Sequence, residues 1–213
     1  MLEDWDDECD YTMGVDVSAG VGSDESVITV LDASSRSLAA QWADAHTTPS
    51  KLAEHILRLG EAYEWPVLVI ESNVYGKRVI EDVIRHGYPR RRMWKTADGK
   101  PWRTHGANRA GMFEIVRSTF EDGFIEKMTK ELYDQVVSIG WNQKKQRPDH
   151  PAGKHDDRLI SLALAIIGAQ DIPLRLPEDR SRVTMEDLIQ KNRVRDSKRP
   201  HPFAVRGGRR RPM

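Results

Sequence analysis

The sequence has a single cysteine among its 213 residues and no long apolar run. One cysteine, Cys9, excludes an intramolecular disulfide and a zinc site built from cysteine ligands. No segment approaches the roughly 18 consecutive apolar residues that are typical of a membrane span. The acidic first residues also lack the basic and apolar regions of a secretory signal. We therefore expect a soluble protein of a reducing cytoplasm, with no membrane partner.

An excess of charge of either sign is also missing, because 33 Lys and Arg balance 33 Asp and Glu. The distribution is uneven: residues 1–10 are acidic, residues 197–213 are strongly basic, and a basic stretch lies between them. The length suits one domain with an appendage. We predict an acidic lead at 1–10, one domain at 11–171, and a basic, proline-rich, largely flexible tail at 172–213. One short helix, at 184–192, is predicted inside that tail.

The order of apolar segments favours an α/β sandwich. Three strand-like segments with short turns between them predict an antiparallel meander, at 11–17, 26–31 and 38–45. A helix follows, with Thr48 as its N-cap and Pro49 in its first position. Val67 to Ile70 is continuously apolar and predicts a strand covered on both faces. Helical spacing predicts further helices at 79–84, 108–120, 130–139 and 159–167. The pattern favours a mixed central β-sheet flanked by helices, and it leaves several α/β folds open.

Acidic residues occur at positions where the neighbouring residues are apolar. Asp16 interrupts the first strand, Glu71 ends the most apolar strand, and Asp156 and Asp157 begin the last helix. Clustered carboxylates repel one another unless a cation lies between them, and Mg²⁺ and Mn²⁺ prefer oxygen ligands. Two such ions about 4 Å apart can stabilise the attacking and leaving oxygens of a phosphoryl displacement. We predict that these four residues are metal-ligating and catalytic in phosphodiester hydrolysis.

Each acidic position also has a purely structural interpretation. Asp16 could be a turn residue, and the aspartate pair could cap its helix and face the positive end of the helix dipole. Glu71 is harder to explain in this way. His155 and Asn73 are candidate neighbours of the metal ligands, whereas His150 is interpreted as a solvated loop residue. The glycine patterns of phosphate loops and dinucleotide sites are incomplete or absent.

The stretch from Pro89 to Arg109 alternates cations with aromatic residues. Cations neutralise phosphates, and aromatic or guanidinium planes stack on bases or sugars. The alternative is a solvated charged loop around a strand at 92–95, with Trp94 in the core. We favour DNA contact because the stretch follows the Glu71 strand. Together with cations of the second helix and of a predicted hairpin tip, the candidate DNA-binding residues are Lys77, Arg78, Arg91, Arg92, Lys95, Lys100, Arg103, Lys144 and Lys145.

Three ordered segments resemble the nuclease domain of the large terminase subunits of tailed bacteriophages and herpesviruses. They are Gly14–Gly20 with Asp24 beyond it, Ile70–Gly76 and His155–Ala165, and the helical segment Lys130–Gln135 also looks like the family's pattern. The resemblance spans roughly residues 11–170, and the ordered set is more specific than any one segment.

This resemblance implies a ribonuclease H-like fold and an endonuclease that cuts concatemeric viral DNA during packaging into procapsids. It implies two bound Mg²⁺ or Mn²⁺ ions. Carried over onto this sequence, the ligands are Asp16, Glu71 and one or both of Asp156 and Asp157, and the resemblance does not choose between the two aspartates.

The resemblance also implies partners: double-stranded DNA, the portal or procapsid, and the small terminase subunit, in the cytoplasm of the host cell. Full-length terminases carry an N-terminal ATPase motor, whose Walker motifs this sequence lacks. Residues 1–10 would then be a former linker to that motor, or the motor would reside on another polypeptide. The basic tail could bind DNA, dock on the portal, or only aid solubility. Two other functions remain open: a Holliday-junction-resolvase-like nuclease of the same fold, and a non-catalytic adaptor that binds DNA or the portal.

Overall fold

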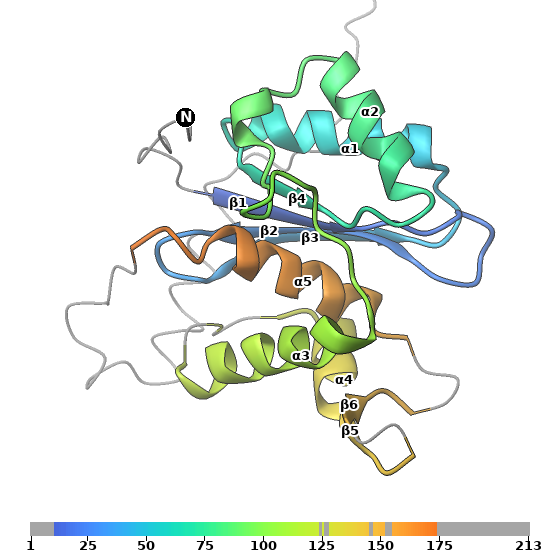
Figure 1. Cartoon of the computed structure of the whole chain (residues 1–213), viewed down its shortest axis with the longest axis vertical. Helices are drawn as coiled ribbons and strands as arrows, with labels where there is room; N and C mark the ends of the chain where they lie inside the picture. The colour runs from blue at the N-terminus through green and yellow to red at the C-terminus, as the bar shows by residue number, and fades with distance from the viewer. Residues whose placement is uncertain (1–10, 124, 126–127, 145–146, 152–154, 174–213) are drawn as a thin grey trace, which may run out of the picture. The chain divides into compact units, whose positions relative to one another are not determined.

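The segments predicted from apolar spacing form helices and strands close to the predicted positions (Figure 1). The computed structural model describes residues 11–173, except for residues 124, 126–127, 145–146 and 152–154. The predicted acidic lead, the helix at 184–192 and nearly all of the basic tail lie outside the described residues. The elements are β1 (Tyr11–Asp16), β2 (Ser26–Asp32), β3 (Leu38–Asp44), α1 (Pro49–Ala62), β4 (Val67–Ile70), α2 (Gly76–Arg85), the 3-10 helix η1 (Arg90–Arg92), α3 (Gly106–Glu121), α4 (Lys130–Ser138), β5 (Gly140–Asn142), β6 (Arg147–Asp149) and α5 (Asp157–Gly168).

The central sheet has four strands in the order β3-β2-β1-β4. The predicted antiparallel meander is confirmed, since β2 is antiparallel to both β1 and β3. In contrast, β4 is parallel to β1, with Val15 paired to Ile70. The sheet is therefore mixed, as predicted. Because β1 and β4 are parallel neighbours, their carboxyl ends lie side by side at one edge of the sheet.

Helices cover both faces of the sheet (Figure 1). On one face, α1 and α2 pack over a core that includes Met13 and Val15 of β1. On the other face, α5 lies against the sheet, and α3 and α4 pack against α5. Successive side chains of a strand point to opposite faces, so Thr12, Gly14 and Asp16 share the face of β1 that α5 covers.

Small residues let α5 approach β1 closely. A Cβ atom on Gly14 would lie 2.1 Å from the carbonyl oxygen of Ser161, so this position requires glycine. The Ser161 hydroxyl donates to the Gly14 carbonyl at 2.9 Å, and the Thr12 hydroxyl donates to the Ala165 carbonyl at 2.8 Å. These contacts fix α5 along β1 and place the first residues of α5 beside the carboxyl end of that strand.

The segment after α2 does not form the predicted strand. Instead of a strand at 92–95, it forms the short helix η1 and one isolated bridge between Met93 and Leu68 of β4. The predicted hairpin is confirmed, with β5 and β6 antiparallel. In the part of the chain that the structure describes, no helix has the length and apolar character that a bilayer crossing requires.

Candidate metal centre

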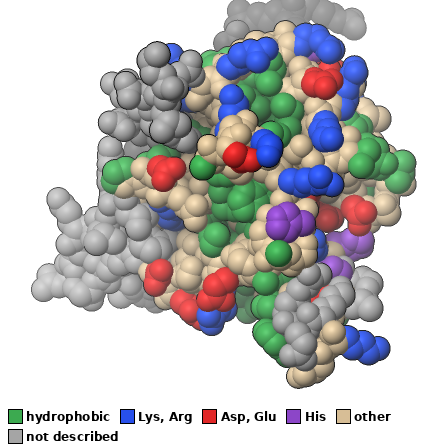
Figure 2. Space-filling view, in the orientation of Figure 1, with side chains coloured by type: hydrophobic (Ala, Val, Ile, Leu, Met, Phe, Trp, Pro, Cys, Tyr) green, Lys and Arg blue, Asp and Glu red, His purple; other side chains and the backbone are tan. Residues whose placement is uncertain are grey.

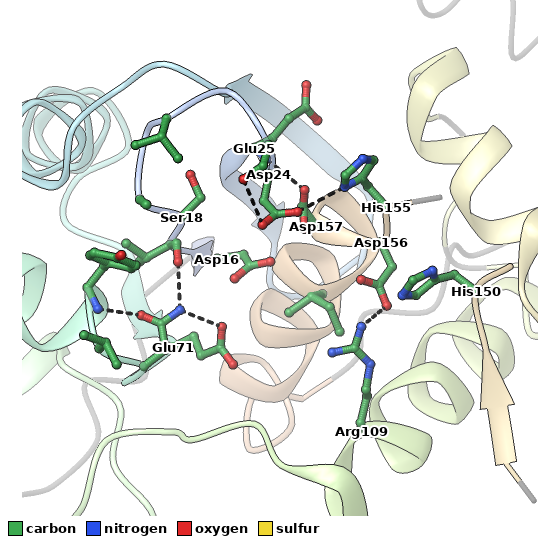
Figure 3. A pocket seen from close by; sticks show the side chains of 18 residues that line it. Asp16, Ser18, Asp24, Glu25, Glu71, Arg109, His150, His155, Asp156 and Asp157 are labelled. Atoms are coloured by element: carbon green, nitrogen blue, oxygen red, sulfur yellow. Dashed lines mark hydrogen bonds and ion pairs between the residues drawn. The ribbon is translucent and has the colours of Figure 1, made fainter. Parts of the chain in front are cut away.

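Two carboxylates meet at the edge where β1 and β4 end. Asp16 is the last residue of β1, and Glu71 follows β4 directly, with its backbone N–H donating to the Val15 carbonyl at 3.0 Å. The Asn73 amide donates to the Val17 carbonyl at 2.7 Å and to a Glu71 carboxylate oxygen at 3.3 Å. Asn73 therefore joins the two strand ends, and Glu71 lies beside Asp16 (Figure 3).

The surroundings of Asp16 penalise its charge. Burial raises the pKa of Asp16 well above its usual value, and the neighbouring Glu71 raises it further through its charge and a hydrogen bond. The charges of Asp157 and Asp156 act in the same direction. A cation placed among these groups would remove the repulsion and restore the ionised form.

The start of α5 supplies the other predicted carboxylates. Asp157 accepts a hydrogen bond from the Glu25 backbone N–H at 2.9 Å. Burial raises the pKa of Asp157 to about 6, although the Glu25 hydrogen bond acts against this shift. Nearby, the His155 ring nitrogen Nδ1 lies 3.2 Å from an Asp24 carboxylate oxygen, and the Arg158 guanidinium binds both oxygens of Glu25 at 2.9 Å. These contacts attach the loop between β1 and β2 to the beginning of α5.

Asp156 occupies the N-cap position of α5, but its side chain makes no capping hydrogen bond. It forms an ion pair with Arg109, which comes from the first turns of α3 (Figure 3). The side chain of Asp156 is only 7% exposed. Asp156 is therefore the N-cap residue, as the helix-cap interpretation has it, but its side chain pairs with a guanidinium from another helix and not with the backbone of α5.

All four predicted metal ligands line one cavity of 810 Å³. Asn73 and His155 belong to its wall, and so does His150, for which the sequence predicts a solvated loop position. One oxygen or nitrogen each of Asp24, His155 and Asp157 lies within 4.8 Å of the others, an arrangement that could hold a metal ion. The carboxylates that line the cavity are Asp16, Asp24, Glu25, Glu71, Asp156 and Asp157.

Sequence reasoning missed several residues of this cavity. Asp24 and Glu25 lie in a glycine- and serine-rich loop, where acids are common and no periodicity marks them. Arg109 stood at the end of a long basic stretch, and nothing in the sequence pointed it toward Asp156. Only the resemblance gave a signal, because its first segment continued to Asp24.

The candidate DNA-binding residues lie outside this cavity. Arg92 is buried, with 9% exposed, and Lys145 falls outside the described residues. Arg78 forms an ion pair with the buried Asp82 on α2. Figure 2 shows Lys and Arg side chains gathered over the layer of α1 and α2. The exposed candidates are Lys77, Arg78, Arg91, Lys95, Lys100, Arg103 and Lys144, and among the described candidates none lines the cavity.

The aromatic residues of the basic stretch are partly buried. Trp94 and Trp102 have ring centroids 5.8 Å apart and pack against the core beneath α5. The position of Trp94 therefore agrees with the alternative interpretation, in which this residue packs in the core. The stretch lies beside the candidate site, because the Trp102 carbonyl accepts the Ser72 backbone N–H at 2.7 Å.

Solved structures similar to this chain are nuclease domains of phage large terminases. The large terminase nuclease of thermophilic phage G20c has a TM-score of 0.59 at 20% identity, covering 78% of this chain and 85% of that chain. Its magnesium-bound form has a TM-score of 0.60, and further structures of it contain cobalt or zinc. The Thermus phage P74-26 large terminase nuclease domain has a TM-score of 0.60 at 18% identity, covering 82% and 87%.

No family model matches the sequence, and no curated protein matches it. At 18–20% identity, the likeness to solved structures concerns the fold. The predicted ribonuclease H-like fold is thereby confirmed.

Proposed function

We propose that this protein is a metal-dependent DNA endonuclease that cuts concatemeric viral DNA during genome packaging. The observation that carries the proposal is the convergence of Asp16, Glu71, Asp156 and Asp157 on one cavity. Residues far apart in the sequence bring mutually repelling carboxylates together, at a cost that a bound cation offsets. The fold that holds them is similar to terminase nucleases whose structures contain magnesium, cobalt or zinc.

The donor set fits hard divalent cations. It consists of carboxylate oxygens and one imidazole, a chemistry suited to Mg²⁺ and Mn²⁺. Asp16 and Glu71 would hold one ion, and Asp24, His155 and Asp157 would hold the second. The charge of Asp157 also acts on Asp16. Two such ions would stabilise the attacking and leaving oxygens of phosphodiester hydrolysis. The chain itself holds the carboxylate oxygens in place, through the Asn73 amide, the Glu25 backbone N–H and the packing of α5.

Double-stranded DNA is the proposed substrate. The amino end of α2, with exposed Lys77 and Arg78, follows directly on Val74 and Tyr75, which line the cavity. The backbone bond between Trp102 and Ser72 places the basic stretch next to the same edge. Phosphates approaching the cavity would therefore meet Lys and Arg side chains before the carboxylates. The same proposal includes the portal or procapsid and the small terminase subunit as partners, and the host cytoplasm as the location. It also includes a nuclease domain that spans residues 11–171.

A plasmid-cleavage assay tests this function. The wild type is incubated with Mg²⁺, Mn²⁺, Ca²⁺ or EDTA, beside Glu71→Ala and Asp157→Ala. Glu54→Ala is the matched control, because Glu54 is an exposed carboxylate on α1. We expect nicking and linearisation in Mg²⁺ or Mn²⁺, unchanged in the control and abolished by EDTA and by either site substitution. Cleavage that survives both substitutions would refute the site.

Other DNA substrates and a DNA-binding measurement separate the remaining alternatives. A Holliday-junction-resolvase-like enzyme would cut a four-way junction in preference to linear duplex DNA of the same sequence. A non-catalytic adaptor would bind DNA without cutting it under any metal. The convergence of carboxylates on one cavity argues against an adaptor, because a protein that binds no cation gains nothing from holding repelling carboxylates together.

A further inference from the structure

The adjacent residues Asp156 and Asp157 have different surroundings. Asp157 lies with Asp24 and His155 in the group whose ligand atoms are within 4.8 Å of one another. Asp156 is not in that group, and one of its oxygens is occupied by the guanidinium of Arg109. The two side chains therefore point to different partners, one to the loop between β1 and β2 and the other to α3 (Figure 3).

Arg109 lies between two cavities. It lines the cavity of the carboxylates and also a second cavity of 370 Å³, whose wall includes Thr104, His105 and His150. Among the described residues that line either cavity, Arg109 alone is Lys or Arg. Its side chain is 27% exposed, and its guanidinium packs over the Phe113 ring at 5.6 Å from the centroid.

A guanidinium has five N–H donors, and one carboxylate oxygen satisfies few of them. One nitrogen of the Arg109 guanidinium donates a hydrogen bond to Asp156. In Figure 3 another of its nitrogens faces the side of the cavity where Glu71 lies. Asp156 and Phe113 fix the plane of the guanidinium from two sides. An arginine oriented in this way can bind a phosphate through paired N–H donors.

We propose that the two aspartates have separate roles: Asp157 is an ion ligand, whereas Asp156 orients Arg109 to bind a phosphate of the DNA strand being cut. This inference rests on the proposed nuclease function. Asp156 is the weaker candidate ligand because its charge is already balanced by Arg109. The second cavity, which is lined by two histidines and by the carboxylates Glu71 and Asp149, would give the strand a path past Arg109.

Ion binding is tested by calorimetric titration of the full chain with Mn²⁺ alone. We expect Asp157→Asn to weaken Mn²⁺ binding by about 10-fold or more, because even the loss of a residue that only supports a ligand typically costs about 10- to 100-fold. Asp156→Asn and Arg109→Met should remain within about 3-fold of the wild type, since neither removes a ligand in this scheme. Equal loss of Mn²⁺ affinity in Asp156→Asn and Asp157→Asn would overturn the division of roles.

Phosphate binding is tested with a short DNA duplex, by fluorescence anisotropy in Ca²⁺ and by single-turnover cleavage in Mg²⁺. Asp156→Asn and Arg109→Met should each lower cleavage and DNA affinity by about 10-fold, the scale of a charge-assisted hydrogen bond. The double variant should be no worse than either single one, because both remove the same contact. Arg109→Lys keeps the charge and the pairing but not the fork, and should recover only part of the loss. Arg117→Met, on the exposed face of α3, is the matched control.

Thermal unfolding of each variant identifies loss of fold, and Arg109→Lys remains informative if Arg109→Met is unstable. A wild type that cuts DNA, with Arg109→Met and Arg109→Lys both unaffected, would refute the phosphate role and leave the nuclease proposal intact. A wild type that binds Mn²⁺ but neither binds nor cuts DNA would refute both.

Discussion

Asp157 combines a half-buried position with two neighbouring carboxylates, Asp24 and Asp156, and this combination predicts a pH dependence of stability. Its pKa is raised from 3.8 to about 6, first by burial and then by Asp24 and Asp156. A raised pKa means that the folded chain binds the proton more tightly than the unfolded chain does. The carboxyl therefore favours folding below pH 3.8, and this contribution is lost as the pH rises through about 6.

We therefore expect Asp157→Asn to stabilise the metal-free protein at pH 7. The amide carries no charge and can still accept the Glu25 N–H. The gain should be about 1–2 kcal/mol, because a shift of this size is worth at most about 3 kcal/mol and solvent screening reduces it. Denaturant unfolding at pH 4 and pH 7 in EDTA measures the effect, which should nearly vanish at pH 4. Added Mn²⁺ should reverse the order at pH 7, and a variant less stable than the wild type in EDTA would contradict the argument.

At the scale of elements, the contact between α5 and β1 positions the whole site. Gly14→Ala would place a methyl group 2.1 Å from the Ser161 carbonyl oxygen, so α5 must move away from the strand. We expect a loss of about 3 kcal/mol or more in the free energy of unfolding, at the upper end for overpacked cores. Gly111→Ala on α3 is the matched control, since nothing lies within 4 Å of its added methyl, and helix propensity predicts a gain of about 1 kcal/mol.

If Gly14→Ala folds, its nuclease activity should fall more than its stability, because a displaced α5 moves Asp156 and Asp157 away from Asp16. Circular dichroism and the plasmid assay, run on the same sample, separate the two effects. Full activity in a stably folded Gly14→Ala protein would mean that α5 does not fix the site.

The elements that could be predicted are those whose signal is local. The Thr48 cap and Pro49 marked the start of α1, and the apolar run of β4 marked a strand buried on both faces. The acids at strand ends, Asp16 and Glu71, stood out for the same reason, because they interrupt local apolar patterns.

What could not be predicted depends on how distant elements meet. Arg109 and Asp156 are 47 residues apart and come together only because α3 packs on α5. Asp24 reaches His155 only because the loop between β1 and β2 folds over the start of α5. Arg36 is buried and donates to the carbonyls of Ala169 and Ile172 at the end of α5, although its sequence context is a polar turn. The spacing of residues in the sequence does not predict these contacts.

At the scale of the whole molecule, a net charge of zero conceals a separation of charge that suits a nuclease. Carboxylates line the cavity, while exposed Lys and Arg lie on α2 and the segment that follows it (Figure 2). The acids would repel DNA unless cations neutralised them, and the basic surface would attract DNA in either case. Binding and cutting should therefore depend on different residues and respond differently to salt and to metal.

Lys77 on α2 and Lys95 after η1 test this separation, because both are exposed and neither lines the cavity. Each substitution, Lys77→Ala or Lys95→Ala, should weaken duplex binding at every sequence tested. Each should also reduce the slope of log affinity against log salt concentration by about one, since each removes one phosphate contact. Lys51→Ala, at an exposed lysine on α1, is the control and should leave the slope unchanged.

Anisotropy titrations across a range of salt concentrations measure the slope, and single-turnover cleavage at saturating protein should stay near the wild-type rate. An unchanged slope in both variants would place the DNA on another face and leave the cavity without the basic approach that we propose.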